Sequence, residues 1–122
     1  MNIQELVHTW FDLWKTGDFE SLPLTEDFTH TSPYGTIRSK AEYFALAAAN
    51  RDAFLGNTFE IHEMLFDAHK ACIRYTMRSP TGTLEVSEWI YEKNGLIAEI
   101  IAYYNLEEER EAGRSIEIKS DS

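Results

Sequence analysis

The sequence predicts an α+β fold in which helices cover one face of a curved antiparallel sheet. Apolar residues recur at helical spacing in the first half of the chain, whereas the second half holds long β-rich runs. The connections between those runs are short, as expected between antiparallel strands. An Asn94-Gly95 pair separates the last two runs. This pair is a strong β-hairpin signal, because both residues accept a positive φ.

The first helix is expected over residues 3–16, where the apolar side chains leave one hydrophobic face. Asn2 is the predicted N-cap, and Glu5 three residues later completes a capping box. Gly17 stands where the C-terminus of a helix favours a left-handed residue.

A short helical turn over 18–23 and an extended stretch over 27–37 are expected to follow. The second long helix is predicted from the capping box that begins at Ser39 and is expected to end at Gly56.

Four strands are expected in the second half, over 58–66, 70–79, 83–93 and 96–105. The Asn94-Gly95 turn pairs Lys93 with Leu96, and a three-residue loop over 80–82 pairs Ser79 with Thr83. One face of the sheet then carries Ile73, Tyr75, Met77, Trp89, Tyr91, Ile100 and Tyr104. The other face carries Cys72, Arg74, Glu88, Ile90, Ile97, Glu99, Ile101 and Tyr103.

Both faces of this predicted sheet are partly apolar, and the helices can cover only one of them. The uncovered side is expected to hold Ile90, Ile97, Ile101 and Tyr103. An exposed apolar patch of this kind indicates a partner surface. The simplest prediction is a homodimer formed through the outer sheet face.

Composition places the chain among soluble globular domains. It has 122 residues, 43% of them hydrophobic, and a net charge of −10. That charge argues against binding to nucleic acid or to an anionic membrane surface. The single cysteine, Cys72, excludes an internal disulfide, and the N-terminus lacks signal-peptide features. A cytoplasmic protein is expected, with one domain over 1–105 and an acidic C-terminal extension over 106–122.

The order of these elements, together with two local strings, resembles the nuclear transport factor 2-like superfamily, particularly its SnoaL-like members. The strings are FTHTSPYG over 28–35 and IIAYYN over 100–105, and the resemblance covers residues 2–105. It implies a cone-shaped, cystatin-like fold whose curved sheet wraps around the long N-terminal helix. A hydrophobic pocket would open at the wide end, and many members are homodimers through the sheet.

The resemblance implies functions from ketosteroid isomerisation, ring closure, dehydration and epoxide hydrolysis to transport without catalysis. Compared with the ketosteroid isomerases, the general-base aspartate position holds Ser32 and the protonated aspartate position holds Ser87. Trp10 stands at the oxyanion-hole tyrosine. Serine and indole cannot shuttle a proton as a carboxylate does, so Ser32, Trp10 and Ser87 argue against the isomerase reaction. SnoaL-like cyclases use a carboxylate base, and separately from the isomerase comparison Asn105 stands where many relatives place an aspartate at the end of the last strand.

His30 is the candidate acid or base. It alternates with Phe28 and Ser32 on an extended segment, so all three side chains are expected to face the pocket. Its imidazole suits proton transfer near neutral pH. The alternative is a core histidine bonded to a backbone carbonyl or to Tyr75.

The remaining candidate ligand-binding residues are mostly aromatic: Trp14, Tyr75, Ser87, Trp89 and Tyr104. Trp10 is expected in the core. Glu63 either faces the pocket as a base with a raised pKa, or is turned outward by a bulge or paired with an arginine such as Arg78. The histidines do not have metal-ligand spacing, so neither a metal nor another cofactor is expected.

Three functions remain open from the sequence. The first is a SnoaL-like protein that binds a small hydrophobic molecule without demonstrable catalysis. The second is an isomerase, cyclase or dehydratase that uses His30 as acid and base. The third is a non-catalytic dimeric interaction module whose outer sheet face and acidic tail form the functional surface.

Overall fold

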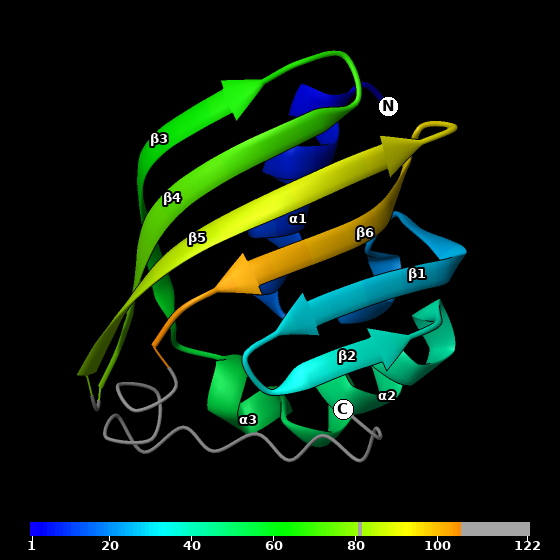
Figure 1. Cartoon of the computed structure of the whole chain (residues 1–122). Helices are drawn as coiled ribbons and strands as arrows, with labels where there is room; N and C mark the ends of the chain where they lie inside the picture. The colour runs from blue at the N-terminus through cyan, green and yellow to red at the C-terminus, as the bar shows by residue number, and fades with distance from the viewer. Residues whose placement is uncertain (81, 106–122) are drawn as a thin grey trace.

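The computed structural model describes residues 1–80 and 82–105, so the predicted extension over 106–122 lies outside the described residues. The helical elements are α1 (Ile3–Thr16), the 3-10 turn η1 (Phe19–Ser21), α2 (Lys40–Ala49) and α3 (Arg51–Phe54). The strands are β1 (Leu24–Ser32), β2 (Gly35–Arg38), β3 (Thr58–Phe66), β4 (Lys70–Ser79), β5 (Gly82–Lys93) and β6 (Leu96–Tyr103), as Figure 1 shows. The α+β prediction is confirmed.

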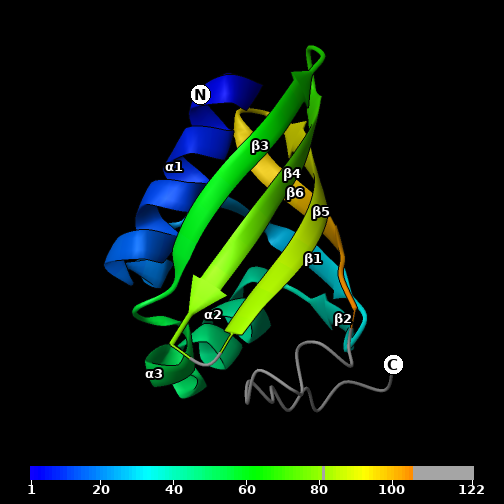
Figure 2. The same cartoon turned by 90° about the vertical axis from the view of Figure 1, so that its left-hand side faces the viewer.

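The strands form one curved sheet in the order β2-β1-β6-β5-β4-β3. In Figure 2, α1 and α2 lie on the concave side of this sheet. The predicted meander of four strands is present, and the extended stretch before α2 adds β1 and β2 to it. β1 pairs with β6 in parallel. α2, α3 and four strands lie between them along the chain, which is long enough for the crossover that parallel strands need.

The ends of α1 agree with the sequence prediction. The Asn2 side chain accepts a hydrogen bond from the backbone N–H of Glu5 at 2.9 Å, and the Glu5 carboxylate accepts one from Asn2 N–H at 3.0 Å. Gly17 closes the helix in the left-handed region, at φ 80°. Its N–H donates to the carbonyl of Leu13 at 2.9 Å. These bonds satisfy backbone groups that a helix end leaves without partners.

The second helix ends earlier than predicted. α2 ends at Ala49, and the short α3 follows after Asn50. The Asn50 side-chain amide donates to the carbonyl of Leu46 at 2.9 Å. Asparagine competes for helix carbonyls in this way, which favours a helix end at such a residue. The helical region still closes before Gly56, whose φ is 86°.

The predicted register between β4 and β5 is wrong by one residue. Ser79 pairs with Gly82, not with Thr83, so the loop between these strands has two residues. Tyr75 consequently lies opposite Val86, where the sequence analysis places Ser87. A shift of one residue turns every side chain of a strand to the other face.

The hairpin between β5 and β6 begins as predicted, with Lys93 opposite Leu96. A bulge between Tyr91 and Glu92 then shifts the pairing, so that Tyr91 lies opposite Glu99. A bulge adds one residue to one strand, which cannot be read from the turn alone.

The corrected register reverses the predicted facing of β5. Glu88 and Ile90 are buried on the concave side, whereas Trp89 is 37% exposed on the convex side. Ser87, which pairs with Tyr103, also faces outward. The expected positions of Ser87 and Trp89 inside the pocket are therefore wrong.

The apolar patch on the convex face differs in part from the predicted set of residues. Ile90 and Ile97 are fully buried and do not belong to it. The convex face instead carries an outer row, defined as Leu65, Cys72, Trp89 and Ile101, which lie opposite one another on β3, β4, β5 and β6. Leu65 is 70% exposed. The homodimer through this face stays a prediction.

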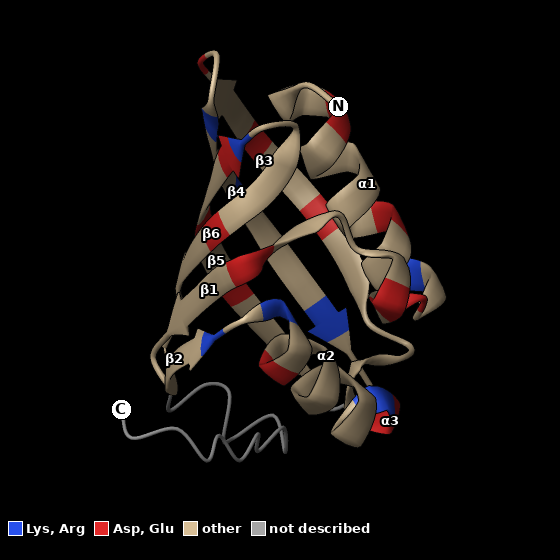
Figure 3. Cartoon of the chain, turned by 90° about the vertical axis from the view of Figure 1, so that its right-hand side faces the viewer, with Lys and Arg blue, Asp and Glu red and all other residues tan. Residues whose placement is uncertain are grey.

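Lys and Arg do not gather into one basic patch in the view of Figure 3, where acidic residues are spread over α1 and the strands. The described part of the chain contains no helix that is long and apolar enough to cross a membrane.

Candidate functional site

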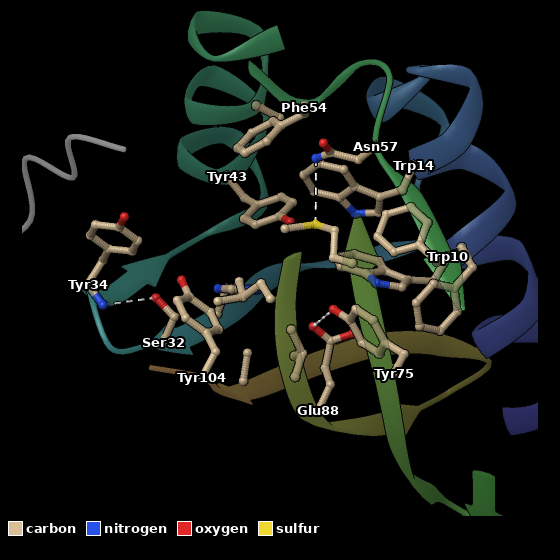
Figure 4. A pocket seen from close by; sticks show the side chains of 18 of the residues that line it. Trp10, Trp14, Ser32, Tyr34, Tyr43, Phe54, Asn57, Tyr75, Glu88 and Tyr104 are labelled. Atoms are coloured by element: carbon tan, nitrogen blue, oxygen red, sulfur yellow. Dashed lines mark hydrogen bonds between the residues drawn. The ribbon is translucent and has the colours of Figure 1, made fainter. Parts of the chain in front are cut away.

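A pocket lies between α1, α2 and the concave face of the sheet (Figure 4). Its cavity volume is about 120 Å³. A dry protein cavity of about 150 Å³ accepts benzene, so this pocket has room for roughly one ring. Its walls are mainly apolar, which is typical of sites for small organic molecules.

Aromatic side chains form much of the wall. Trp10 and Trp14 lie one turn apart on α1, with ring centroids 5.9 Å apart. Phe54 from α3 packs edge-on against Trp14 at 4.8 Å. Phe11 and Tyr75 meet at 5.1 Å, also edge-on. These tilted and edge-on contacts are the favoured arrangements of aromatic pairs.

Glu88 on β5 is the acidic residue of this wall. Its side chain enters the pocket because Leu84, Val86 and Ile90 share its parity and all face the core. Glu88 is 4% exposed. Figure 4 shows its carboxyl group directed toward Tyr75, with Trp10 on the same side of the pocket.

The two oxygens of Glu88 have different surroundings. The Tyr75 hydroxyl donates to Oε2 over a long 3.3 Å. Oε1 is buried and has no hydrogen-bond partner of normal geometry among the described residues. Burial raises the pKa of the Glu88 carboxyl to about 7, while hydrogen bonding from Tyr75 and Trp10 partly opposes the rise. Glu88 therefore changes charge near neutral pH.

His30 lines the pocket from β1, as predicted. Its ring lies 5.2 Å from that of Tyr43 and is inclined to it by 32°. Burial lowers the pKa of His30 to about 4. The imidazole is therefore neutral at pH 7, and it does not carry a charge that could balance Glu88.

Four further polar side chains of the wall have described surroundings. Ser32 accepts a hydrogen bond from the backbone N–H of Tyr34 at 3.2 Å. The Asn57 amide lies 3.5 Å from the sulfur of Met77, which is a weak acceptor. Burial raises the pKa of Tyr43 well above its ordinary value, so its hydroxyl stays protonated. The Trp14 indole N–H has no partner of normal geometry among the described residues.

Comparison with known proteins places this architecture in a family. The family model described as a SnoaL-like domain matches residues 7–100. The chain belongs to the SnoaL-like domain family. No curated protein matches the chain.

Solved structures share the fold at low sequence identity. An NTF2-like protein of unknown function from Cytophaga hutchinsonii is 19% identical with a TM-score of 0.74, covering 85% of this chain and 90% of that chain. A candidate polyketide cyclase from Silicibacter sp. is 21% identical with a TM-score of 0.71, covering 92% and 93%. An LEH-like epoxide hydrolase from M. tuberculosis is 14% identical with a TM-score of 0.71, covering 88% and 86%. These likenesses support the fold, which hosts several chemistries.

Within this SnoaL-like domain, five of the sequence-predicted site residues lie together around the pocket: Trp14, His30, Ser32, Tyr75 and Tyr104. Phe28 is fully buried in the core beside His30 and is not part of the wall. Ser87 and Trp89 lie on the convex face. Trp10, expected in the core, is nearly buried and also forms part of the wall.

Glu88 is the site residue that the sequence analysis missed. The resemblance places Ser87 at the protonated-aspartate position of the ketosteroid isomerases, but the next residue supplies the inward carboxyl group. The signal was present in the sequence, because Glu88 lies at the same parity as the aliphatic residues of its strand. The assumed three-residue loop concealed it.

The side chain of Glu63 points away from the pocket, which is the second of the two alternatives given for it in the sequence analysis. A bulge lies between Ile61 and Glu63. The Arg74 Nε donates to the Glu63 carboxylate at 2.9 Å, while Arg78 pairs with Glu60 instead. Among the residues that the structure describes, no group of three metal-ligating side chains occurs.

Proposed function

We propose that this SnoaL-like protein binds a small, mainly apolar molecule in its aromatic pocket, with a polar group of that molecule at Glu88. The observation that carries the proposal is the buried Oε1 of Glu88, which has no hydrogen-bond partner of normal geometry among the described residues. Leaving a buried polar atom without a partner costs about 1–3 kcal/mol. A ligand that donates a hydrogen bond to Oε1 removes that cost, while its apolar part gains from contact with the aromatic wall.

Binding of benzyl alcohol, a neutral single-ring probe with one hydroxyl group, tests this function by titration calorimetry. We expect saturable binding to the wild type. Ala102, which lines the pocket, is replaced by leucine to fill it, and Ala98 on the same strand provides a matched control outside the wall. Ala102→Leu should weaken binding about tenfold or more, and Ala98→Leu should leave it unchanged. Absence of saturable binding, or equal effects of the two variants, contradicts the proposal.

A second candidate function is proton transfer on the bound molecule, because a carboxyl group that titrates near pH 7 suits general acid–base catalysis. Glu88 replaces His30 in this role, since an imidazole with a pKa of about 4 is a weak base at pH 7. The ionised carboxylate would take a proton from a carbon next to a carbonyl group, forming an enolate, and then return it. Such chemistry needs only the ligand and the carboxyl group.

Deuterium exchange at the carbons flanking the carbonyl of cyclohexanone, followed by NMR in D₂O, tests this second function. We expect exchange above the buffer rate, reduced about 100-fold or more toward that rate in Glu88→Gln. Glu63→Gln, which removes an exposed carboxylate from the convex face, is the matched control. Exchange at the buffer rate in the wild type, or unchanged exchange in Glu88→Gln, refutes acid–base use of Glu88.

A further inference from the structure

We propose that the molecule bound in this pocket carries an ammonium group, so that the site accepts small cyclic or aromatic amines and rejects carboxylic acids. This inference rests on the proposed function and names the class of its ligand. It follows from the charges of the pocket wall, from the rings around Glu88 and from the carboxylate oxygen Oε1, which has no hydrogen-bond partner of normal geometry among the described residues.

The wall carries one acidic side chain without a balancing cation. Among the lining residues that the structure describes, Glu88 is the only carboxylate, and neither lysine nor arginine is present. A buried charge in a protein is normally paired. When Glu88 is ionised, no described residue of the wall supplies its positive partner, so a cationic ligand would supply it. An anionic ligand would instead meet a second negative charge.

His30 is the basic side chain of the same wall, and it does not balance Glu88. Burial among Phe28 and Tyr43 keeps its imidazole neutral at pH 7. Tyr43 and Tyr75, the two phenols that interact electrostatically with Glu88, have raised pKa values, so both are also neutral at that pH. Each can donate a hydrogen bond, but neither supplies positive charge.

The rings near Glu88 suit a cation. Trp10 from α1 and Tyr75 from β4 both donate toward the carboxyl group, so their rings lie beside it (Figure 4). Tyr43 from α2 packs against Trp10, with centroids 6.0 Å apart. An ammonium group at a carboxylate and next to tryptophan and tyrosine rings gains both a charge-assisted hydrogen bond and cation–π attraction. A neutral hydroxyl group gains only an ordinary hydrogen bond.

The net charge of the whole chain also favours a cationic ligand. With a net charge of −10, the protein attracts cations and repels anions as they approach. The small cavity adds a size limit, because a volume of about 120 Å³ holds roughly a single ring with a short polar arm. Benzylamine, benzyl alcohol and benzoate share one ring and differ in charge, so they form a matched set of probes.

Dissociation constants of these three probes, measured by titration calorimetry at about pH 8, test the proposal. Glu88 and benzylamine are both mainly charged at this pH. We expect benzylamine to bind about tenfold or more tightly than benzyl alcohol, and benzoate to bind more weakly than either. Glu88→Gln should abolish the preference for the amine, whereas Glu63→Gln, with the same change in net charge on the convex face, should retain it.

The outcomes separate this inference from the function on which it rests. Binding of benzyl alcohol as tight as that of benzylamine overturns the ammonium proposal and leaves the binding function intact. A preference for the amine that persists in Glu88→Gln also overturns it. Absence of binding for all three probes overturns both. The comparison among probes in the wild type does not depend on a variant, so it stands even where Glu88→Gln fails to fold.

Discussion

Replacing Glu88 by glutamine is predicted to change how stability depends on pH. Burial raises the pKa of Glu88 in the folded chain from 4.5 to about 7. The folded protein therefore holds this proton more tightly than the unfolded chain does. The resulting stabilisation is fully present below pH 4.5 and is lost as pH rises through about 7. At 1.36 kcal/mol per pKa unit, the loss is about 3 kcal/mol.

Glutamine has the shape of glutamate without its titration, so the difference between the two proteins isolates this residue. We expect the free energy of unfolding of the wild type to fall by about 3 kcal/mol relative to Glu88→Gln between pH 4.5 and about pH 8. Urea unfolding, followed by tryptophan fluorescence at a series of pH values, measures the free energy of unfolding of both proteins. Parallel pH profiles for the two proteins would refute the buried, titrating carboxyl group.

Three further changes have defined expectations. His30→Asn should flatten the acid side of the stability profile, because the low pKa of His30 contributes about 3 kcal/mol above pH 6.5 that is lost as pH falls through about 4. Urea unfolding at a series of pH values measures this change. Trp89→Glu should reduce self-association through the outer row, measured by sedimentation equilibrium, and an unchanged mass argues against that interface. Gly17→Ala should lower the free energy of unfolding by about 1–2 kcal/mol, because a side chain at φ 80° is strained. Thermal unfolding of the variant and the wild type measures the difference.

The first helix and the Asn94-Gly95 turn were predictable because local chemistry determines them. The Asn2 capping box and the left-handed Gly17 depend on residues a few positions apart. The Asn94-Gly95 turn likewise adopts positive φ at both residues, 54° and 80°. Such features need no knowledge of the distant chain.

The facing of β5 was harder to predict, because it depends on a loop length and on a bulge. Counting Gly82 as part of a three-residue loop moves β5 by one position relative to β4. The bulge between Tyr91 and Glu92 moves β5 by one position relative to β6 as well, so the hairpin with β6 does not reveal the error. The pairing of β1 with β6 joins residues far apart in the sequence, and no local pattern reports it.

The candidate site was predicted in part for the same reason. His30 and Ser32 alternate on one strand, so their common direction follows from strand geometry. The inward position of Glu88 required the correct register of β5. Its high pKa depends on burial against α1 and β4, which the sequence does not state.

The titration of Glu88 itself tests the central claim most directly. Carbon-13 NMR of the Glu88 side-chain carboxyl, assigned by comparison with Glu88→Gln, gives the pKa of this one group in the intact protein. We predict a midpoint near 7 in the free protein, and a lower midpoint when benzylamine saturates the pocket. A midpoint close to the ordinary value of 4.5 that does not respond to benzylamine would contradict a buried carboxyl group at the centre of the binding site.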